Sequence, residues 1–444
     1  MTPTPIHDFL VNYAASNAER CHVPGNKGFP HPFDITEIAG ADDLYDPRGV
    51  ILESERIAAG LFGAARTFYS CSGSTLAIFA MLFSALGSSG KRRVAAARYS
   101  HRSLTDAAVL LGFDIDWVYP REFLSCAVSP DEIDAAVTDE TAAVFVNGTD
   151  YYGGMSDIEA IAGVCRRRGV PLLVDNAQGA YRVFTGRHPI RLGASMCADS
   201  AHKTLPALTG AAYLHIADDS FACRARAGLA LFGTSSPSYL VLDSLDLCNA
   251  HISGEKKRAE AAFEAVARLK SRLADARFTL KGADALRVTA DANARGYRGA
   301  RFAFELKSRG VVCEMFDDKY VVLLFSTVTE SANTDRVFAA MSDIADKGAF
   351  SRPAAAAAPL KLRAALPPRE AFFSPSETVP TARAAGRVCA GILAQNPPCV
   401  PLVVPGEVVT RETVELLERH NIRETACVCP SVSFSGSAAF APPS

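Results

Sequence analysis

The sequence predicts an α/β protein whose largest domain contains a mostly parallel, doubly wound sheet. Segments typical of buried strands alternate with helical segments over residues 67–216, a pattern typical of parallel sheets covered by helices. Residues 285–345 repeat strands and helices in a shorter series, which predicts a smaller α/β domain. The prolines of the remaining segment exclude long regular elements there, so we expect a C-terminal α+β domain of short elements.

A chain of 444 residues exceeds the size of one ordinary domain. We expect an N-terminal arm at residues 1–40, a large domain at 41–255, a small α/β domain at 256–350 and a C-terminal domain at 351–444. An Ala/Pro-rich stretch from Ser351 to Pro359 is typical of a linker and marks the last of these boundaries.

The composition favours a small molecule as the partner, and neither a nucleic acid nor a membrane. The net charge of -2 provides no basic field for a nucleic acid. The N-terminus lacks the basic and apolar segments of a secretory signal, and no window reaches about 18 uninterrupted apolar residues. The twelve cysteines do not show the spacing of a zinc site and predict free thiols. We therefore expect a cytoplasmic protein without a metal site.

The first elements follow from apolar spacing and from glycine and proline. A short amphipathic helix is expected within residues 1–20. Pro24 and Gly25 then force a loop. Apolar residues at helical spacing predict a helix over Ile51–Phe62, which Gly63 ends.

A strand at residues 67–70 leads through Gly73, Ser74 and Thr75 into an apolar helix from Leu76 to Leu86. Small hydroxyl residues and a glycine between a strand and a helix can cradle a phosphate, because the first backbone N–H groups and the helix dipole attract an anion. The same residues are also common in an ordinary helix N-cap. These residues alone leave both interpretations open.

The alternation continues along the large domain. The expected strands are 94–97, 115–119, 142–147 and 170–174, and the expected helices are 104–111, 131–137 and 158–168. His101 follows the first of these strands, where an imidazole ring can stack on a flat cofactor or face solvent. In the smaller domain we expect helices at 298–309 and 334–345 and strands at 311–315 and 320–325.

Two residues 28 positions apart carry the candidate chemistry. Asp175 ends a short buried strand, and ligands of parallel sheets bind at the carboxyl ends of strands. Lys203 follows Ser200 and His202 in the segment DSAHKTLP. Such a pair suits pyridoxal 5'-phosphate (PLP), with the lysine as Schiff base and the aspartate paired with the pyridinium nitrogen.

Taken together, the motifs resemble those of the Orn/Lys/Arg decarboxylases of PLP fold type I, in the short form without an N-terminal wing domain. The resemblance runs from His22-Val23-Pro24-Gly25 to Pro405-Gly406-Glu407. Its motifs are ADDLYDPRGVI, FGAARTFYSCSGST, RYSHRS, DYYGGMSDI, LLVDNAQGAY, DSAHKTLPALTGAAYLH, SSPSYLVLDSLD and PPCVPLVVPGE. They are specific only in combination.

The resemblance implies a role for each candidate residue. Lys203 holds PLP as a Schiff base, and Asp175 pairs with the ring nitrogen. The other implied contacts are the phosphate cradle of Gly73, Ser74, Thr75, Ser200 and His202, the ring of His101 stacked on the pyridine, and Ala177 packed beneath it. His202 or Lys203 returns the proton to Cα, and the sequence does not choose between them.

The chain departs from the usual family pattern at several positions. Asn26 replaces the histidine of a P-G-H-K loop, and Asn176, Gln178 and Tyr181 replace residues of D-E-A-H-G-A-H. Gly391 stands where an acidic residue is usual. A basic substrate tail needs an acceptor of this kind, so the identity of the substrate stays open.

The resemblance implies PLP-dependent decarboxylation of a basic L-amino acid, arginine or lysine in preference to ornithine, to the corresponding amine and CO2. An aminotransferase or lyase reaction and a catalytically silent PLP-binding protein are alternatives, because fold alone does not fix function. The resemblance also implies a homodimer or a higher homo-oligomer whose substrate is a small-molecule amino acid.

Overall fold

The computed structural model describes residues 2–348, 359–395 and 397–430. Contacts divide the chain into two compact units, which we describe separately. The first comprises Met1–Ser103 and Ile115–Pro359, and the second comprises Leu104–Asp114 and Leu360–Ser444. The linker expected at Ser351–Pro359 lies outside the described residues except for its last residue. The four domain boundaries expected above stay a prediction.

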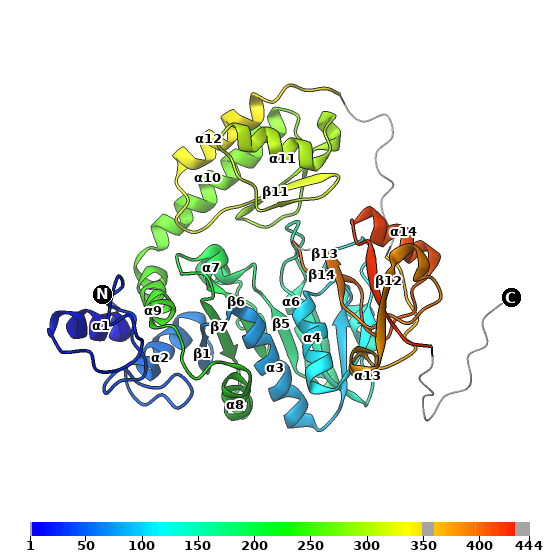
Figure 1. The fold of residues 1–444 in the computed structure, drawn as a ribbon. Coiled ribbons are helices and arrows are strands. Elements are labelled where there is room, and N and C mark those ends of the chain that lie inside the picture. The colour runs from blue at the N-terminus through cyan, green and yellow to red at the C-terminus, as the bar shows by residue number, and fades with distance from the viewer. Residues whose placement is uncertain (1, 349–358, 396, 431–444) are drawn as a thin grey trace. The chain divides into compact units, whose positions relative to one another are not determined.

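The first unit is built on a seven-stranded sheet with the order β1-β7-β6-β5-β4-β2-β3 (Figure 1). Its strands are β1 (Arg66–Ser70), β2 (Arg93–Ala97), β3 (Asp114–Val118), β4 (Thr141–Asn147), β5 (Leu172–Asp175), β6 (Met196–Ser200) and β7 (Ala212–Ile216). β2, β4, β5 and β6 pair in parallel, whereas β7 is antiparallel to both β6 and β1. The connection between β6 and β7 is too short for a parallel crossover. The predicted mostly parallel sheet is confirmed.

Helices cover both faces of this sheet, as a doubly wound fold requires. They are α2 (Val50–Phe62), α3 (Gly73–Ser89), α5 (Pro130–Ala136), α6 (Ile158–Arg168), α7 (Ala201–Thr204), α8 (Ala222–Phe232) and α9 (Tyr239–Gly254). Val144 and Val146 of β4 pack in one cluster with Ile161 of α6. Phe145, which lies between them, points to the other face and is also fully buried. Both faces of β4 are therefore core.

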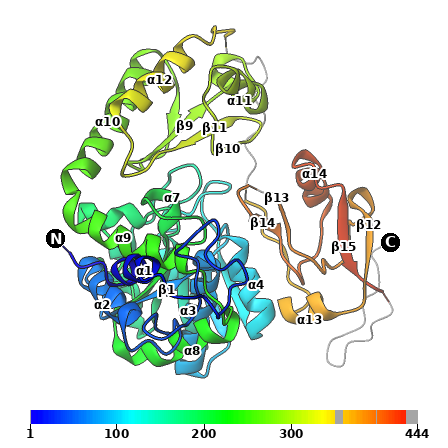
Figure 2. The same cartoon turned by 60° about the vertical axis from the view of Figure 1, so that its left-hand side comes forward.

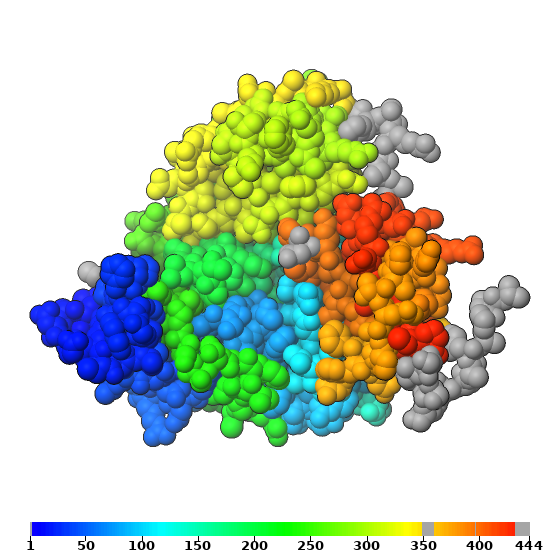
Figure 3. Space-filling view, in the orientation of Figure 1, coloured from blue at the N-terminus to red at the C-terminus, as the bar shows by residue number. Residues whose placement is uncertain are grey.

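The N-terminal arm carries α1 (Pro5–Ala15), whose Ile6 and Leu10 are fully buried. Figures 1 and 2 both show α1 beside α9, and the blue arm forms one lobe in Figure 3. Asp246 of α9 explains this position, because its Oδ2 accepts the backbone N–H groups of Ile6 and His7 over 2.9 and 3.0 Å. The aspartate thus supplies acceptors for the first turn of α1.

A smaller antiparallel sheet with the order β10-β11-β9-β8 belongs to the same unit. Its elements are α10 (Lys256–Asp275), β8 (Leu280–Lys281), β9 (Arg287–Asp291), α11 (Gly299–Ser308), β10 (Met315–Phe316), β11 (Tyr320–Leu324) and α12 (Ser331–Ser342). The strand predicted at 311–315 is wrong in its bounds, because β10 comprises only Met315 and Phe316 and therefore shares one residue with the predicted range. Gly310 has a φ of 79°, and the Val311 N–H donates to the Leu306 carbonyl, so this segment closes α11.

The second unit consists of short elements. They are most of α4 (Arg102–Leu111), α13 (Pro368–Phe373), α14 (Arg411–Arg419), the antiparallel pair β12 (Ser376–Pro380) and β15 (Glu424–Val428), and the antiparallel pair β13 (Leu393–Gln395) and β14 (Val400–Val403). Arg369 of α13 donates to the Val109 and Leu110 carbonyls at the end of α4, over 2.8 and 2.9 Å. This contact joins the two sequence segments of the unit.

Two expectations about the whole chain are also tested. All twelve cysteines lie within the described residues, and each of them is a free thiol, as predicted. Among the described helices, none combines the length and the apolar character needed to span a bilayer.

Candidate active site

The carboxyl ends of β5 and β6 bring Asp175 and Lys203 near each other. Asp175 lies opposite Ala198 in the parallel register, and Lys203 lies in α7, directly after the end of β6. Burial raises the pKa of the Asp175 carboxyl, while the Ala177 N–H and the Lys203 charge act to lower it. The lysine is therefore within electrostatic reach of the aspartate.

The backbone around Asp175 fixes its carboxylate. Oδ1 accepts the Ala177 N–H over 3.0 Å, and the Asp175 carbonyl accepts the Gly148 N–H over 2.8 Å. The Asn176 N–H donates to the Ala198 carbonyl over 2.9 Å, which continues the β5–β6 ladder beyond the strand. Asp175 and Ala177, which are both predicted to face the ring, are buried.

The first turn of α3 and the end of β6 meet at two serines. Ser200 Oγ donates to Ser74 Oγ over 2.9 Å. α3 begins at Gly73, which has a φ of 69° and open space where a Cβ would lie. Ser72, in the N-cap position, makes no side-chain cap hydrogen bond. The ordinary cap interpretation is thus not realised, and the turn that includes Thr75 keeps the arrangement of an anion cradle.

Gly210, which the sequence analysis did not single out, completes this arrangement. Its carbonyl accepts the Gly73 N–H over 2.8 Å, and a Cβ on Gly210 would lie 2.9 Å from the Cys71 carbonyl oxygen. A side chain would separate the β6–β7 loop from the start of α3. The glycine that ends the TLPALTG segment was the available signal.

His101 is a neutral imidazole close to Lys203. Burial, with smaller contributions from the charges of Lys203 and Arg102, lowers the pKa of His101 to about 4. The Ser103 N–H donates to His101 Nδ1 over 3.2 Å, so Nδ1 is an acceptor and the neutral ring carries its proton on Nε2. A neutral aromatic ring is suited to lie against a flat heterocycle.

His202 and Tyr151 also lie near the lysine. His202 Nδ1 donates to the Ala211 carbonyl over 3.0 Å, and burial lowers the pKa of His202, so its Nε2 is left as a base. The Lys203 Nζ lies 5.8 Å from the centre of the Tyr151 ring, in the loop after β4. Sequence reasoning missed Tyr151, although its place after a strand of the parallel sheet was a signal.

Two departures from the family pattern contact the smaller sheet. Gln178 Oε1 accepts from Arg287 Nη2 over 2.8 Å, and the Tyr181 hydroxyl donates to Asp284 Oδ2 over 3.0 Å. All four side chains are buried. These substitutions therefore join the loop after β5 to the smaller sheet of the same unit, and they leave Asp175 and Lys203 in place.

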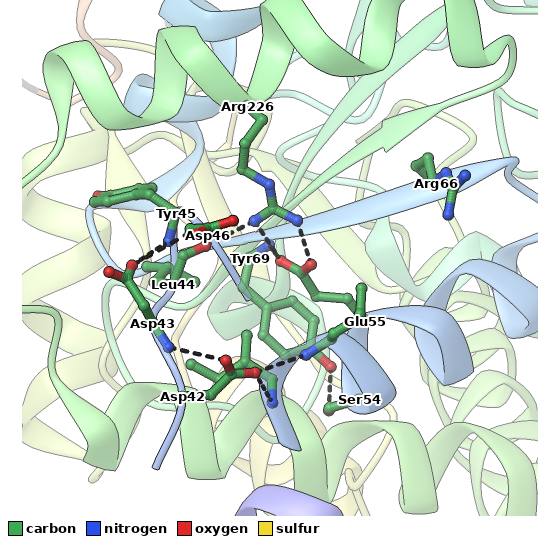
Figure 4. A network of polar contacts seen from close by, with 12 residues as sticks. Asp42, Asp43, Leu44, Tyr45, Asp46, Ser54, Glu55, Arg66, Tyr69 and Arg226 are labelled. Atoms are coloured by element: carbon green, nitrogen blue, oxygen red, sulfur yellow. Dashed lines mark hydrogen bonds and ion pairs between the residues drawn. The ribbon is translucent and has the colours of Figure 1, made fainter. Parts of the chain in front are cut away.

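A different polar network lies beside β1, α2 and α8 (Figure 4). The buried Glu55 accepts from Arg226 and from the Tyr69 N–H, each over 3.0 Å. Asp42 accepts the Gly49 and Ile51 N–H groups before and within the first turn of α2. A cavity of about 290 Å³ lies next to this network, and it is lined by none of the predicted site residues. The ADDLYDPRG motif is thus explained as a helix cap in which Asp42 accepts backbone N–H groups, while Glu55 and Arg226 form an ion pair.

The matches to known families cover most of the chain. The family described as "Orn/Lys/Arg decarboxylase, major domain" matches residues 4–289. The family described as "Orn/Lys/Arg decarboxylase, C-terminal domain" matches residues 355–425. The two matches include every residue of the site described above and most of the second unit.

Curated relatives and solved structures agree with these matches. The chain is 27% identical to an arginine decarboxylase of Bacillus anthracis over 94% of this chain and 93% of the relative. An arginine decarboxylase of Bacillus subtilis (strain 168) is also 27% identical, with 93% of both chains covered. Lysine decarboxylase A from Pseudomonas aeruginosa has the same fold, with a TM-score of 0.80, 19% identity, and coverage of 96% of this chain and 80% of that one.

Proposed function

The chain belongs to the Orn/Lys/Arg decarboxylase family, and we propose that it removes the α-carboxylate of arginine or lysine with PLP as its cofactor. The observation that carries this proposal is the position of Lys203 within electrostatic reach of the buried Asp175, at the carboxyl ends of β5 and β6. Relatives named arginine decarboxylase and a similar structure named lysine decarboxylase support the choice of substrates.

The donor set fits PLP. The start of α3 offers an anion site with no side-chain cap, and the Ser74 and Ser200 hydroxyls lie beside it. Asp175 is the buried carboxylate, and Lys203 is the amine close to it. When bound, PLP supplies a protonated ring that accepts the electron pair left at Cα when CO2 departs.

Each side chain then has a distinct task. Lys203 provides the amine that binds the aldehyde, and Asp175 keeps the ring nitrogen protonated. Ser74, Thr75 and Ser200 hold the phosphate at the start of α3. The neutral ring of His101 packs against the pyridine, and its lack of charge avoids repulsion from a cationic ring. Ala177 packs beneath the ring, where a larger side chain would occupy the space for the cofactor.

The proton that replaces the carboxylate comes from a residue next to Cα. His202 Nε2 and Lys203 Nζ are the two candidates. His202 fixes its other nitrogen on the Ala211 carbonyl, so the orientation of its Nε2 is defined. We propose that Lys203 is the donor, because its amine would be released beside Cα once the substrate amine took its place, whereas His202 carries its proton on Nδ1.

The assembly and the alternatives belong to the same proposal. We propose a homodimer or a higher homo-oligomer, as the family resemblance implies. An aminotransferase or lyase would use the same lysine and aspartate, and a silent PLP-binding protein would keep both without turnover. Because Gly391 removes the usual acidic residue, the choice between arginine and lysine must be measured.

A product assay tests the proposed function. The purified protein is incubated with PLP and with arginine, lysine, ornithine or leucine, and both the amine and CO2 are quantified. We expect agmatine or cadaverine in equal amount to CO2, with no product from leucine. A keto acid in place of the amine identifies the aminotransferase alternative. PLP binding without any product identifies the silent one.

A further inference from the structure

A fully buried polar cluster lies on the face of β6 that is not turned toward Lys203. Asp199 is its centre, with Oδ1 accepting from Asn176 Nδ2 over 2.8 Å and Oδ2 accepting from His188 Nε2 over 2.9 Å. His215 Nε2 lies 3.4 Å from Oδ2, and the Cys197 Sγ lies 3.5 Å from Oδ1. The side chains of Asp199, His188 and His215 have no solvent exposure.

The position of this carboxylate in the chain links it to the active site. Asn176 directly follows Asp175, and Asp199 directly precedes Ser200. The Asn176–Asp199 hydrogen bond therefore connects the residue after the ring-facing aspartate to the residue before the phosphate-facing serine. Lys203 follows on the same short segment. One side-chain contact thus spans the ends of both strands that carry the site.

The space around Asn176 supports a fixed geometry. A Cβ on Gly179 would lie 2.2 Å from Asn176 Oδ1, and a Cβ on Gly148 would lie 2.7 Å from the same atom. The amide therefore lies between two backbone segments that only glycine allows. This close packing restricts its rotation and directs Nδ2 toward Asp199.

We propose that Asp199 is a positioning residue for the decarboxylation, acting through Asn176 to hold Asp175 against the cofactor ring in register with Ser200 and Lys203. The inference rests on the proposed function. It adds a residue that touches neither substrate nor cofactor, but that sets the placement and the charge of the aspartate that does.

The charge of Asp199 adds to its geometric effect. Burial acts to raise the pKa of Asp199, but His188 and His215 outweigh it and hold the pKa well below its ordinary value. The carboxylate is therefore ionised at neutral pH, and its negative charge acts to raise the pKa of Asp175. An aspartate with a higher proton affinity is a better partner for a protonated ring nitrogen.

The cluster could in principle bind a metal ion. His188, Asp199 and His215 offer ligand atoms that all lie within 4.8 Å of one another. The proton positions favour a hydrogen-bonded cluster. The Ile190 N–H points at His188 Nδ1 over 3.4 Å, so Nδ1 is an acceptor and Nε2 carries the proton that Asp199 accepts. A metal ion would have to displace this proton and the hydrogen bond to Asp199.

The test replaces Asp199 by asparagine, which keeps the size of the side chain and removes its charge. The holoenzyme, the PLP-free enzyme and its titration with PLP are compared between wild type and D199N. We expect D199N to bind PLP roughly tenfold more weakly, because the variant loses the charged acceptor that fixes Asn176 next to the ring-facing Asp175. At saturating PLP we expect kcat to fall about tenfold with an unchanged KM for the amino acid.

D246N is the matched control, because Asp246 is also a buried carboxylate of the same unit but contacts α1 and Ser54. We expect D246N to change the melting temperature without changing the PLP affinity or kcat. A double variant with N176A should lose little beyond D199N alone, since both changes break one contact. This non-additivity identifies the Asn176–Asp199 hydrogen bond as the contact through which Asp199 acts.

Several outcomes overturn the inference. If D199N keeps the wild-type PLP affinity and kcat and changes only the melting temperature, Asp199 has a structural role alone. Stoichiometric zinc in the purified wild type, lost in D199N, assigns the cluster to a metal ion instead. A wild type that neither binds PLP nor releases an amine contradicts the proposed function itself, and is thereby distinguished from failure of this inference alone.

Discussion

Ser200 Oγ donates a hydrogen bond to Ser74 Oγ over 2.9 Å, so the last residue of β6 meets the first turn of α3. The two serines lie more than a hundred residues apart in the chain. Their contact defines one edge of the anion cradle, and Lys203 follows Ser200 by three positions. A cofactor whose phosphate is held by these two serines would therefore have its aldehyde end near the Lys203 amine.

Replacing either serine with alanine should weaken PLP binding. A hydrogen bond to a charged group is worth about 1.5–3 kcal/mol, so S74A and S200A should each reduce the affinity by about 10- to 100-fold. S84A is the control, because Ser84 lies on the same helix and donates to the Phe221 carbonyl. Titration of the PLP-free enzyme with PLP measures the effect. Equal affinities for S74A, S200A and S84A would show that the phosphate binds elsewhere.

Replacing Lys203 with alanine should remove both the visible absorption band of lysine-bound PLP and the decarboxylase activity. Without the amine the cofactor is held only by non-covalent contacts, and kcat should fall by at least about a thousandfold. K256A is the control, because Lys256 is an exposed residue at the start of α10. Amine production and the absorption spectrum are recorded on the same samples. Activity that survives in K203A would discard this lysine as the one that binds PLP.

The parts of the fold that the sequence predicted well are those with local signals. α2 ends where Gly63 adopts a φ of 73°, and α6 ends where Gly169 adopts a φ of 65°. Both glycines are visible in the sequence as caps after an apolar pattern. The strand predicted at 311–315 failed, because the same apolar residues serve to close α11. The spacing of apolar residues does not by itself distinguish a short strand from the segment that closes a helix.

For the candidate site too, the residues with local sequence signals were predicted and the residues joined only by folding were missed. Asp175 and Lys203 were predicted from strand ends and spacing, and the structure brings them within electrostatic reach. The Asp199 cluster was missed, because His188 and His215 reach Asp199 through contacts that only the folded sheet creates. An acidic residue inside a fully buried strand was the available signal, since such a charge requires partners.

The neutral state of His101 predicts a loss of stability at mildly acidic pH. Its pKa falls from an ordinary value of 6.5 to about 4 in the folded protein. Between these values the unfolded chain binds more protons, so the free energy of unfolding decreases as pH falls from about 6.5 toward 4. His215 has the same shift and contributes in the same window.

H101F should remove the His101 share of this dependence. A phenylalanine keeps an aromatic ring and does not titrate, so the melting temperature of H101F should fall less than that of wild type between pH 7 and pH 5. H101A, which lacks the ring, should bind PLP several-fold more weakly than H101F. If the melting temperatures of wild type and H101F fell by the same amount between pH 7 and pH 5, this result would contradict a neutral, buried His101. Equal PLP affinities for H101A and H101F would contradict the stacking role.

The contact of Gln178 with Arg287 predicts that this departure from the family pattern affects stability and not the choice of reaction. In Q178A the buried Arg287 loses an acceptor, which should cost about 1–3 kcal/mol of the free energy of unfolding. Q178E restores an acceptor and should recover part of this loss. Y181F removes the hydroxyl that donates to Asp284 and accepts the Ala285 N–H, and it should cost about 1–3 kcal/mol. Urea unfolding measures all three variants.

The products of the same Gln178 and Tyr181 variants decide the role of these side chains. If they serve to join the smaller sheet to the loop after β5, each variant should still release an amine and CO2 in equal amounts, with the same order of preference among arginine, lysine and ornithine. A variant that keeps wild-type stability but changes this order, or that yields a keto acid, would place the side chain against the substrate. The prediction of an unchanged order follows from burial, because both side chains are buried and bind Arg287 and Asp284 of the same unit.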